Sequence, residues 1–213
     1  MRYQFLVDTY ATERLKVLSV WSMFRDEDLP IRPNPSDPRG RSVLEHMVHQ
    51  CTGENNWFSG MLGISLDNAP LPAAETRLAF IERYAADSLS RLNALATKEA
   101  AWWEEETAFF DVRRSRAWIL VRRIAHTAHH RGQQMAMLRM LGREVYSNYG
   151  PTADTGGLAQ NGGRTVYAYP DARTLIEGEA AGGKKEPLPA AGPNPVSERT
   201  QSPPAGGGSG HRV

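Results

Sequence analysis

The sequence predicts an all-α fold: a four-helix bundle with a long first crossover, followed by a disordered C-terminal tail. Four segments of comparable length place apolar residues three, four or seven positions apart, the spacing that gathers them on one face of a helix. No segment shows a convincing strand alternation. A polar, proline-rich connection at residues 26–40 is long enough to cross the bundle instead of making a tight turn.

The first two predicted helices flank this connection. In the first, the apolar positions are Leu6, Tyr10, Val17, Trp21 and Phe24. The second opens with "SVLE", a capping box in which Ser42 accepts a hydrogen bond from a free amide while Glu45 reaches back. Its apolar positions are Leu44, Met47, Val48, Cys51, Phe58 and Leu62. Each helix is therefore expected to bury one face in the core.

The last two predicted helices are separated by an aromatic and acidic stretch. The third carries Leu78, Ile81, Ala85, Leu89, Leu92 and Leu95. The fourth runs from about residue 115 to residue 141, and Gly142 follows as a C-terminal stop. Between them lies "AWWEEETAFFD", residues 101–111, which we expect to cap one end of the bundle either as a short hairpin or as a helical extension.

The composition divides the chain into three parts. Residues 1–155 hold the four helical segments and make the predicted bundle domain. Residues 156–181 form a partly ordered extension. From about residue 182 to residue 213 the chain is rich in proline, glycine and serine and has very few large apolar residues. Such a segment buries too little surface to offset its ordering entropy, so we expect a disordered tail.

Charge and hydropathy exclude several classes of protein. The formal net charge of +1 offers no basic surface for nucleic acid. A single cysteine, Cys51, excludes an intrachain disulfide framework. The N-terminus lacks the unbroken apolar region of a secretory signal, and no run approaches the roughly 18 apolar residues of a membrane span. We therefore expect a soluble cytoplasmic protein with no nucleic-acid or membrane partner.

The stretch "HTAHHRGQQ", residues 126–134, places three histidines within the fourth helix. His126 and His130 share a stripe with apolar residues seven positions before and after them, so both are expected to face the bundle one turn apart. His129 projects to the side. Two imidazoles at positions i and i+4 can bind one metal ion from the same helix face.

A third ligand would have to come from another helix. His46 and His49 on the second helix are the candidates, and their spacing leaves them nearly tied. Three interpretations are open at this point: a metal site, a hydrogen-bonded polar cluster, or metal-free acid–base chemistry, since histidine titrates near neutrality.

Two familiar metal chemistries are unsupported by the spacing. A zinc peptidase of the H-E-x-x-H type needs a glutamate after its first histidine, and here Thr127 follows His126. A ferritin-like di-iron site needs E-x-x-H pairs. Glu45 and His49 are four positions apart, which is the wrong spacing.

These motifs resemble the DinB/YfiT-like family of bacterial four-helix proteins. The resemblance covers roughly residues 1–155 and rests on "HTAHHRGQQ", on "VLEHMVHQCTGENNWF" upstream and on "MLGREVYSNYGPTAD" downstream. It implies a bundle with a long crossover. It also implies three histidines around one divalent ion, one from the second helix and two from the fourth.

The family pattern on the second helix is a histidine followed five residues later by an acidic residue and eight later by an aromatic one. Counting from His49 gives Glu54 and Trp57, whereas counting from His46 gives no match. The resemblance therefore implies that His49, His126 and His130 are the metal ligands. The residues expected to surround them or line their pocket are His46, His129, Gln133, Glu54 and Trp57.

The resemblance also suggests an activity. Characterised relatives include thiol S-transferases that use low-molecular-weight bacterial thiols. It therefore implies a metal-dependent transferase that joins a small-molecule thiol to a small electrophile, with zinc, nickel or iron as the ion because imidazole suits all three. The alternative is a non-catalytic, stress- or damage-inducible protein that binds metal or a ligand in the same pocket. We expect a homodimer in either case.

Three neighbouring residues carry weaker expectations. Gly132, in mid-helix, is unfavourable by about 1 kcal/mol relative to alanine, which suggests close approach of a helix or ligand. Arg131 is expected to be a surface cation or a helix-end partner, with an anion clamp as the alternative. Cys51 lies on the apolar stripe and is expected to be a buried packing residue.

Overall fold

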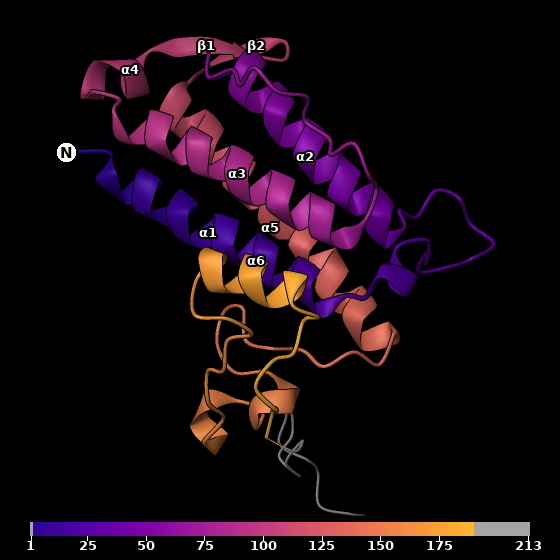
Figure 1. Ribbon diagram of the computed structural model, residues 1–213. Coiled ribbons are helices and arrows are strands. Elements are labelled where there is room, and N and C mark those ends of the chain that lie inside the picture. The colour runs from indigo at the N-terminus through magenta and orange to yellow at the C-terminus, as the bar shows by residue number, and fades with distance from the viewer. Residues whose placement is uncertain (1, 190–213) are drawn as a thin grey trace, which may run out of the picture.

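The chain is mostly helical in the computed structural model, which describes residues 2–189. Four long helices lie side by side (Figure 1): α1 (Gln4–Met23), α2 (Val43–Gly60), α3 (Arg77–Ala96) and α5 (Arg116–Met140). The shorter elements are η1 (Asp26–Asp28), α4 (Ala100–Glu104), β1 (Glu106–Phe109), β2 (Val112–Ser115), η2 (Ala153–Thr155), η3 (Ala159–Asn161) and α6 (Ala172–Ala180). The described helices include none with the length and hydropathy needed to cross a bilayer.

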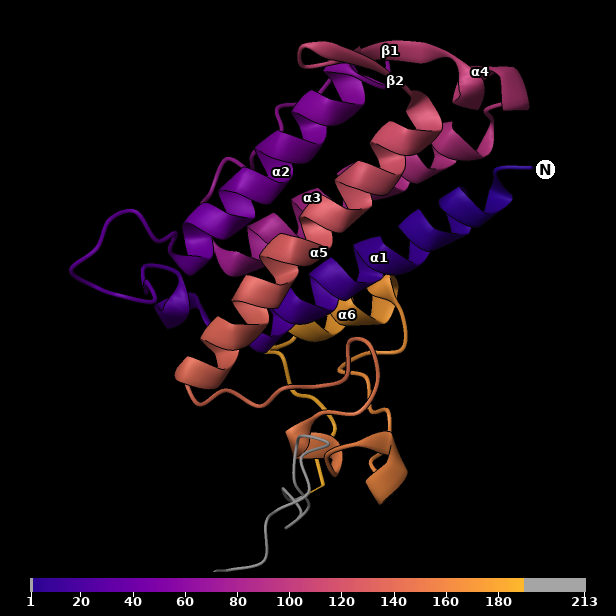
Figure 2. The ribbon, with the colours of Figure 1, turned by 180° about the vertical axis from the view of Figure 1, so that it is seen from behind.

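The four long helices form a ring in which α1 and α2 occupy opposite corners. Helix α1 packs against α3 and α5, and so does α2. Helices α1 and α5 run in one direction and α2 and α3 in the other (Figures 1 and 2). Two contacts at the end of α1 agree with this: Asp26 accepts from the Arg77 amide that begins α3, and Ile31 accepts from the Val43 amide that begins α2.

The connections agree with the predicted topology only in part. The first, residues 24–42, joins the diagonal pair α1 and α2 but stays at one end of the ring. The second, residues 61–76, returns along the length of the helices (Figures 1 and 2). It must do so because α2 and α3 are parallel, and a helix of 18 residues is about 27 Å long. The lengthwise crossover thus belongs to the second connection, which the sequence did not single out.

The stretch at residues 101–111 forms both alternatives that the sequence left open. Helix α4 comes first, and β1 then pairs with β2 as an antiparallel hairpin in the register Glu106↔Ser115 to Phe109↔Val112. The all-α fold class therefore leaves out this hairpin, although the sequence kept a hairpin open as one alternative. Strands β1 and β2 have four residues each, which is too short for an alternation of apolar and polar residues to be recognised in the sequence. At the turn, Phe110 has a φ of 52°, an uncommon conformation for a residue with a side chain.

The predicted helix ends are present. Ser42 Oγ accepts from the Glu45 amide at 3.2 Å, and Glu45 Oε2 accepts from the Ser42 amide at 2.8 Å, so the capping box begins α2. Gly142, with a φ of 64°, follows α5. The amide after it, that of Arg143, donates back to the Leu138 carbonyl at 3.0 Å, as in a glycine-terminated helix.

The apolar core has two halves separated by buried polar residues. One half surrounds Val17, Trp21, Met47 and Met137. The other lies nearer the hairpin and contains Leu6, Phe58, Leu62, Leu95, Trp103 and Ile119. Between them the four helices bury the side chains of Arg14, Gln50, Glu54, Ser88, Arg91, Arg123 and Thr127. This polar layer lies at the level of the histidine motif.

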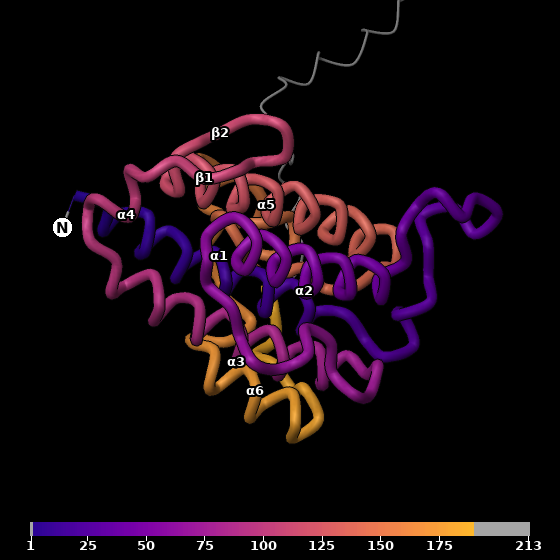
Figure 3. Tube along the Cα trace, turned by 90° about the horizontal axis from the view of Figure 1, so that it is seen from above, coloured from indigo at the N-terminus to yellow at the C-terminus, as the bar shows by residue number. Residues whose placement is uncertain are grey.

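The C-terminal extension packs on the outside of the ring. Helix α6 contacts α1 and α3, on the side away from the hairpin (Figure 3). The Glu179 carboxylate accepts from the Tyr169 hydroxyl and pairs with Arg77 and Lys185. The domain boundary placed at residue 155 stays a prediction.

Residues 182–189, predicted to be the start of the tail, are held against the protein. Lys185 pairs with Glu179, the Tyr146 hydroxyl donates to the Glu186 carbonyl, and Leu188 packs on the core. Disorder is the wrong expectation for this part, because the segment includes contacts with residues such as Tyr146, 40 positions before Glu186, which local composition does not show. The rest of the predicted tail, residues 190–213, lies outside the described residues.

Gly132 and Gly53 give a matched test of helix packing. A Cβ at Gly132 would meet nothing within 4 Å, so the close approach expected there is absent. A Cβ at Gly53 would lie 3.2 Å from Arg123 Nη1. Gly132→Ala should raise the free energy of unfolding by about 0.5–1 kcal/mol in urea titrations. Gly53→Ala should raise the free energy of unfolding little or not at all, because the new methyl group would crowd Arg123. Equal increases in the two variants would contradict this crowding.

Candidate metal centre

Three histidines from two helices come together on one side of the ring. His49 lies on α2, and His126 and His130 lie one turn apart on α5. Their ligand nitrogens all lie within 4.8 Å of one another. The closest pair is Nε2 of His126 and Nε2 of His130, at 2.9 Å. The packing of α2 on α5 brings the His49 ring to 4.5 Å from the His130 ring, between centroids.

The three imidazoles fit a divalent metal ion. Nitrogen ligands of one tetrahedral zinc ion lie about 3.3 Å apart, which small side-chain rotations would reach from the present separations. Imidazole must be neutral to bind a metal. The cluster is therefore compatible with metal binding on both geometry and chemistry.

The surroundings keep these imidazoles neutral. Burial and the charge of Arg123 lower the pKa of His126 to about 4. Burial and the neighbouring His126 lower the pKa of His130 to about 3. The pKa of His49 is lowered by burial and by the charges of Arg41 and Arg123. At neutral pH all three rings carry lone pairs for a metal.

Gln133 orients one of the three rings. Its Oε1 lies 3.2 Å from Nδ1 of His130, and its Nε2 lies 3.1 Å from Nε2 of His129. The amide oxygen therefore accepts from a protonated Nδ1, which leaves Nε2 of His130 free to coordinate. His129 itself is exposed and contacts the His130 ring at 5.0 Å.

His46 lies deeper than His49. It is 3 % exposed, and its ring centroid lies 5.6 Å from that of His130. Burial and the charge of Arg41 lower its pKa to about 4. Its Nδ1 has no hydrogen-bond partner among the described residues. His46 therefore lies beside the cluster of three without joining it.

Aromatic side chains extend from the cluster to the hairpin. The Trp57 ring centroid is 5.8 Å from that of His126 and 5.3 Å from that of Phe109. Phe110, 72 % exposed at the hairpin turn, lies 6.2 Å from Trp57, and Trp118 lies 5.0 Å from Phe109. We call Trp57, Phe109, Phe110 and Trp118 the aromatic wall. It offers apolar contact directly beside His126.

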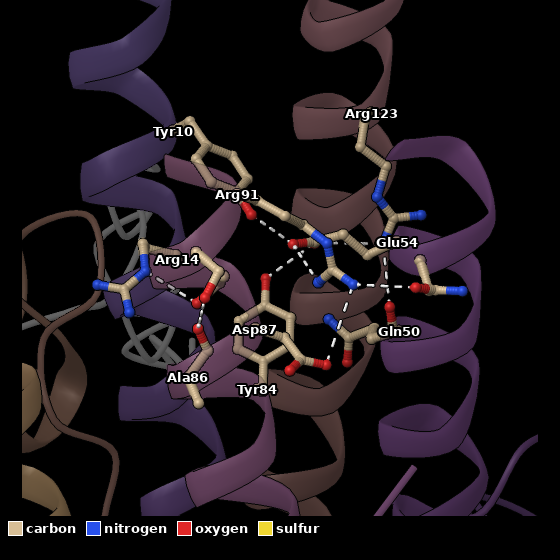
Figure 4. Close-up of polar contacts among 12 residues, drawn as sticks. Tyr10, Arg14, Gln50, Glu54, Tyr84, Ala86, Asp87, Arg91 and Arg123 are labelled. Atoms are coloured by element: carbon tan, nitrogen blue, oxygen red, sulfur yellow. Dashed lines mark hydrogen bonds and ion pairs between the residues drawn. The ribbon is translucent and has the colours of Figure 1, made fainter. Parts of the chain in front are cut away.

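Glu54 lies inside the ring, where side chains from all four long helices meet (Figure 4). Its Oε1 accepts from the Tyr10 hydroxyl at 2.5 Å, and its Oε2 accepts from the Tyr84 hydroxyl at 3.0 Å. Arg91 and Arg123 pair with the same carboxylate at 3.5 and 3.6 Å. Burial raises the pKa of both tyrosines, so their hydroxyls keep the protons that they donate.

Arg123 joins this layer to the histidines. It lies on α5 one turn before His126, and its guanidinium is 5.8 Å from the Trp57 ring centroid. It also donates to the Gln50 carbonyl at 3.3 Å. Glu54, which was expected near the metal ligands, is thus connected to them through Arg123 and not by a direct contact.

The sequence pattern did not predict that arginines are buried in this layer. Arg91 and Arg123 are each 1 % exposed. Arg91 lies four residues before Leu95 and Arg123 four after Ile119, so both occupy the buried stripe, whereas Leu89, placed on the stripe, is 47 % exposed. The surface assignment of Arg131 is also wrong, because it is 1 % exposed. It pairs with Glu13 of α1.

The fold and the histidine cluster define a class of mostly helical protein with a metal-compatible three-histidine site. The sequence model of the DinB family matches residues 5–160, so the chain belongs to the DinB family. A crystal structure of a DinB-like protein from Bacillus cereus superposes with a TM-score of 0.53 at 18 % identity, covering 68 % of this chain and 93 % of that one. No curated protein sequence matches the chain.

Replacing Glu54 should destabilise the protein strongly. Glu54→Gln leaves Arg91 and Arg123 buried without their carboxylate, and breaking a buried pair on one side is unfavourable by about 3–5 kcal/mol. The measurement is urea unfolding. Glu82→Gln, at an exposed position of α3, is the control and should change stability by under about 0.5 kcal/mol. Equal effects of the two changes would contradict a central role for Glu54.

The lowered histidine pKa values set a pH dependence for the protein stripped of metal with a chelator. An unfolded histidine titrates near pH 6.5, but His126 and His130 resist protonation until about pH 4 and 3. The unfolded state therefore binds protons first, so stability is complete above about pH 6.5 and falls as the pH drops toward 4. Urea midpoints from pH 7.5 to 5 should decline, and His126→Gln should flatten that decline. A wild-type urea midpoint that does not change between pH 7.5 and 5 would contradict the lowered pKa values of His126 and His130.

Proposed function

We propose that this protein binds one divalent metal ion through His49, His126 and His130 and catalyses thiol-dependent S-transfer to small electrophiles. The observation that carries the proposal is the set of three neutral imidazoles whose nitrogens lie within 4.8 Å of one another. Three protein ligands leave coordination positions open, as in catalytic metal sites and unlike closed structural ones. Zinc, nickel and iron all suit imidazole ligands.

The chemistry would be a substitution. A divalent ion in such a site lowers the pKa of a bound thiol or water and so supplies a nucleophile near neutral pH. The thiol sulfur forms a bond to the electrophilic carbon, the leaving group departs with its electron pair, and the thiol proton passes to solvent.

Basic residues around the cluster support an anionic cosubstrate. Burial lowers the pKa of His49 and of His126 most, and the charges of Arg41 and Arg123 on His49 and of Arg123 and Arg122 on His126 lower it further, so all three arginines lie within electrostatic reach of the imidazoles. The same field favours a thiolate over a thiol. Gln133 would hold His130 in the tautomer that coordinates.

The aromatic wall would contact the electrophile. Trp57 lies beside His126, and Phe110 exposes most of its ring to solvent at the turn of the hairpin. Large exposed apolar side chains beside a polar cluster are typical of a binding surface. His46 and His129 would complete the surroundings of the ligands.

A second candidate is a metal- or ligand-binding protein without turnover, induced by stress or damage. It needs no substrate cavity beside the three histidines, and the cavities of about 210 and about 760 Å³ are both lined by other residues. It requires the same metal ligands. The homodimer and the cytoplasmic location stay predictions.

Metal content distinguishes the ligands. Untagged wild-type protein should contain one divalent ion per chain, and His49→Ala should lose it. The loss of affinity should exceed the 10–100-fold typical of changes around metal ligands. His46→Ala, the matched control on the same helix, should keep the ion. The measurement is elemental analysis with calorimetric titration; metal retained in His49→Ala and lost in His46→Ala would reverse the assignment.

Turnover then separates the two candidates. Metal-loaded protein is incubated with a panel of low-molecular-weight bacterial thiols and a chromogenic electrophile. Product formation that requires both metal and thiol supports the transferase. One ion per chain with no turnover for any thiol supports the non-catalytic candidate.

A further inference from the structure

A cavity of about 210 Å³ lies between α1 and the segment that follows α5. None of the three clustered histidines lines it. Its apolar walls are Leu15, Leu18, Tyr167, Tyr169, Pro170 and Leu175. It exists because the C-terminal extension, anchored through Glu179, spans the outer face of α1 without filling the space beneath. We call it the extension cavity.

Two residues that line the cavity carry polar atoms without partners. Ser19 Oγ and Asn148 Oδ1 are buried and have no hydrogen-bond partner among the described residues. Asn148 is 3 % exposed, and its Nδ2 donates to the Lys16 carbonyl at 3.1 Å. That contact fixes the orientation of the amide, so the unpartnered atom is the acceptor. A buried acceptor without a partner is destabilising, which favours a ligand that donates to it.

The charged groups at this cavity are already engaged. The Lys16 ammonium pairs with Glu13 at 2.8 Å and lies 3.6 Å from the Tyr149 ring centroid. The Asp171 carboxylate accepts from the amide and the hydroxyl of Thr174, at the start of α6. A charged ligand would find no free counter-charge on either side chain, and burying an unpaired charge is strongly unfavourable.

The size sets the scale of the occupant. Apolar cavities of about 150 Å³ bind benzene, so the extension cavity would hold a molecule somewhat larger. Ligand sites combine apolar walls with a few placed polar groups. We propose that the extension cavity is a second binding site, specific for an uncharged, largely apolar ring compound that carries one N–H or O–H donor. This site is independent of the proposed metal chemistry.

Indole and benzofuran test the donor directly. The two molecules have the same shape, but indole carries an N–H where benzofuran has an oxygen. Calorimetric titration of the full chain should give saturable 1:1 binding of indole and about fivefold or more weaker binding of benzofuran. Equal affinities, or tighter binding of benzofuran, would show that the site does not recognise a hydrogen-bond donor and would overturn the proposal. No binding of indole would also overturn it.

A cavity-filling variant tests the location. Leu15→Trp places a large ring into the cavity and should abolish indole binding while leaving the circular dichroism spectrum unchanged. Leu89→Trp, at an exposed position of α3, is the matched control and should bind indole as wild type does. If Leu15→Trp misfolds, Ser19→Met fills part of the same space and removes the hydroxyl. Undiminished indole binding in a folded cavity-filling variant would place the site elsewhere and refute the assignment.

Discussion

The architecture depends on the buried carboxylate of Glu54. Tyr10 from α1, Tyr84 and Arg91 from α3 and Arg123 from α5 converge on this one group of α2. A carboxylate removed from water needs several partners, and each partner here belongs to a helix that packs on its neighbours in the ring. The interaction sets the register of the four helices against one another and divides the apolar core in two.

The histidine cluster inherits its geometry from that layer. His49 lies on the same helix as Glu54, and His126 follows Arg123 by one turn of α5, so the ion pair between Glu54 and Arg123 holds the two histidine-bearing helices in register. Together with burial, which has the larger effect, the same guanidinium lowers the pKa of His49 on α2 and of His126 on α5. One residue thus contributes both to the position of the imidazoles and to their neutrality, and the core and the candidate site are parts of one electrostatic arrangement.

Helical spacing alone predicts the long helices, the cap of α2 and the pair His126 and His130, because these features depend on neighbours within a few residues. The choice of His49 over His46 needed the family resemblance, since the two differ only in how α2 rotates against α5. The sequence did not reveal that Arg91 and Arg123 are buried, because the carboxylate that pairs with them, Glu54, belongs to another helix. The hairpin was too short for its strands to show in the pattern, and residues 182–189 are held in part by Tyr146, which is 40 residues away from Glu186 in the sequence.

The diagonal placement of α1 and α2 has a consequence for synthesis on the ribosome. The first two helices to emerge share few contacts, among them those of Tyr10 with Glu54 and Phe58, so neither can bury most of its apolar face until α3 follows. The ring closes only when α5, its last member, joins both of them. Because α5 also carries two of the three clustered histidines, a nascent chain cannot assemble the cluster until translation has passed residue 140.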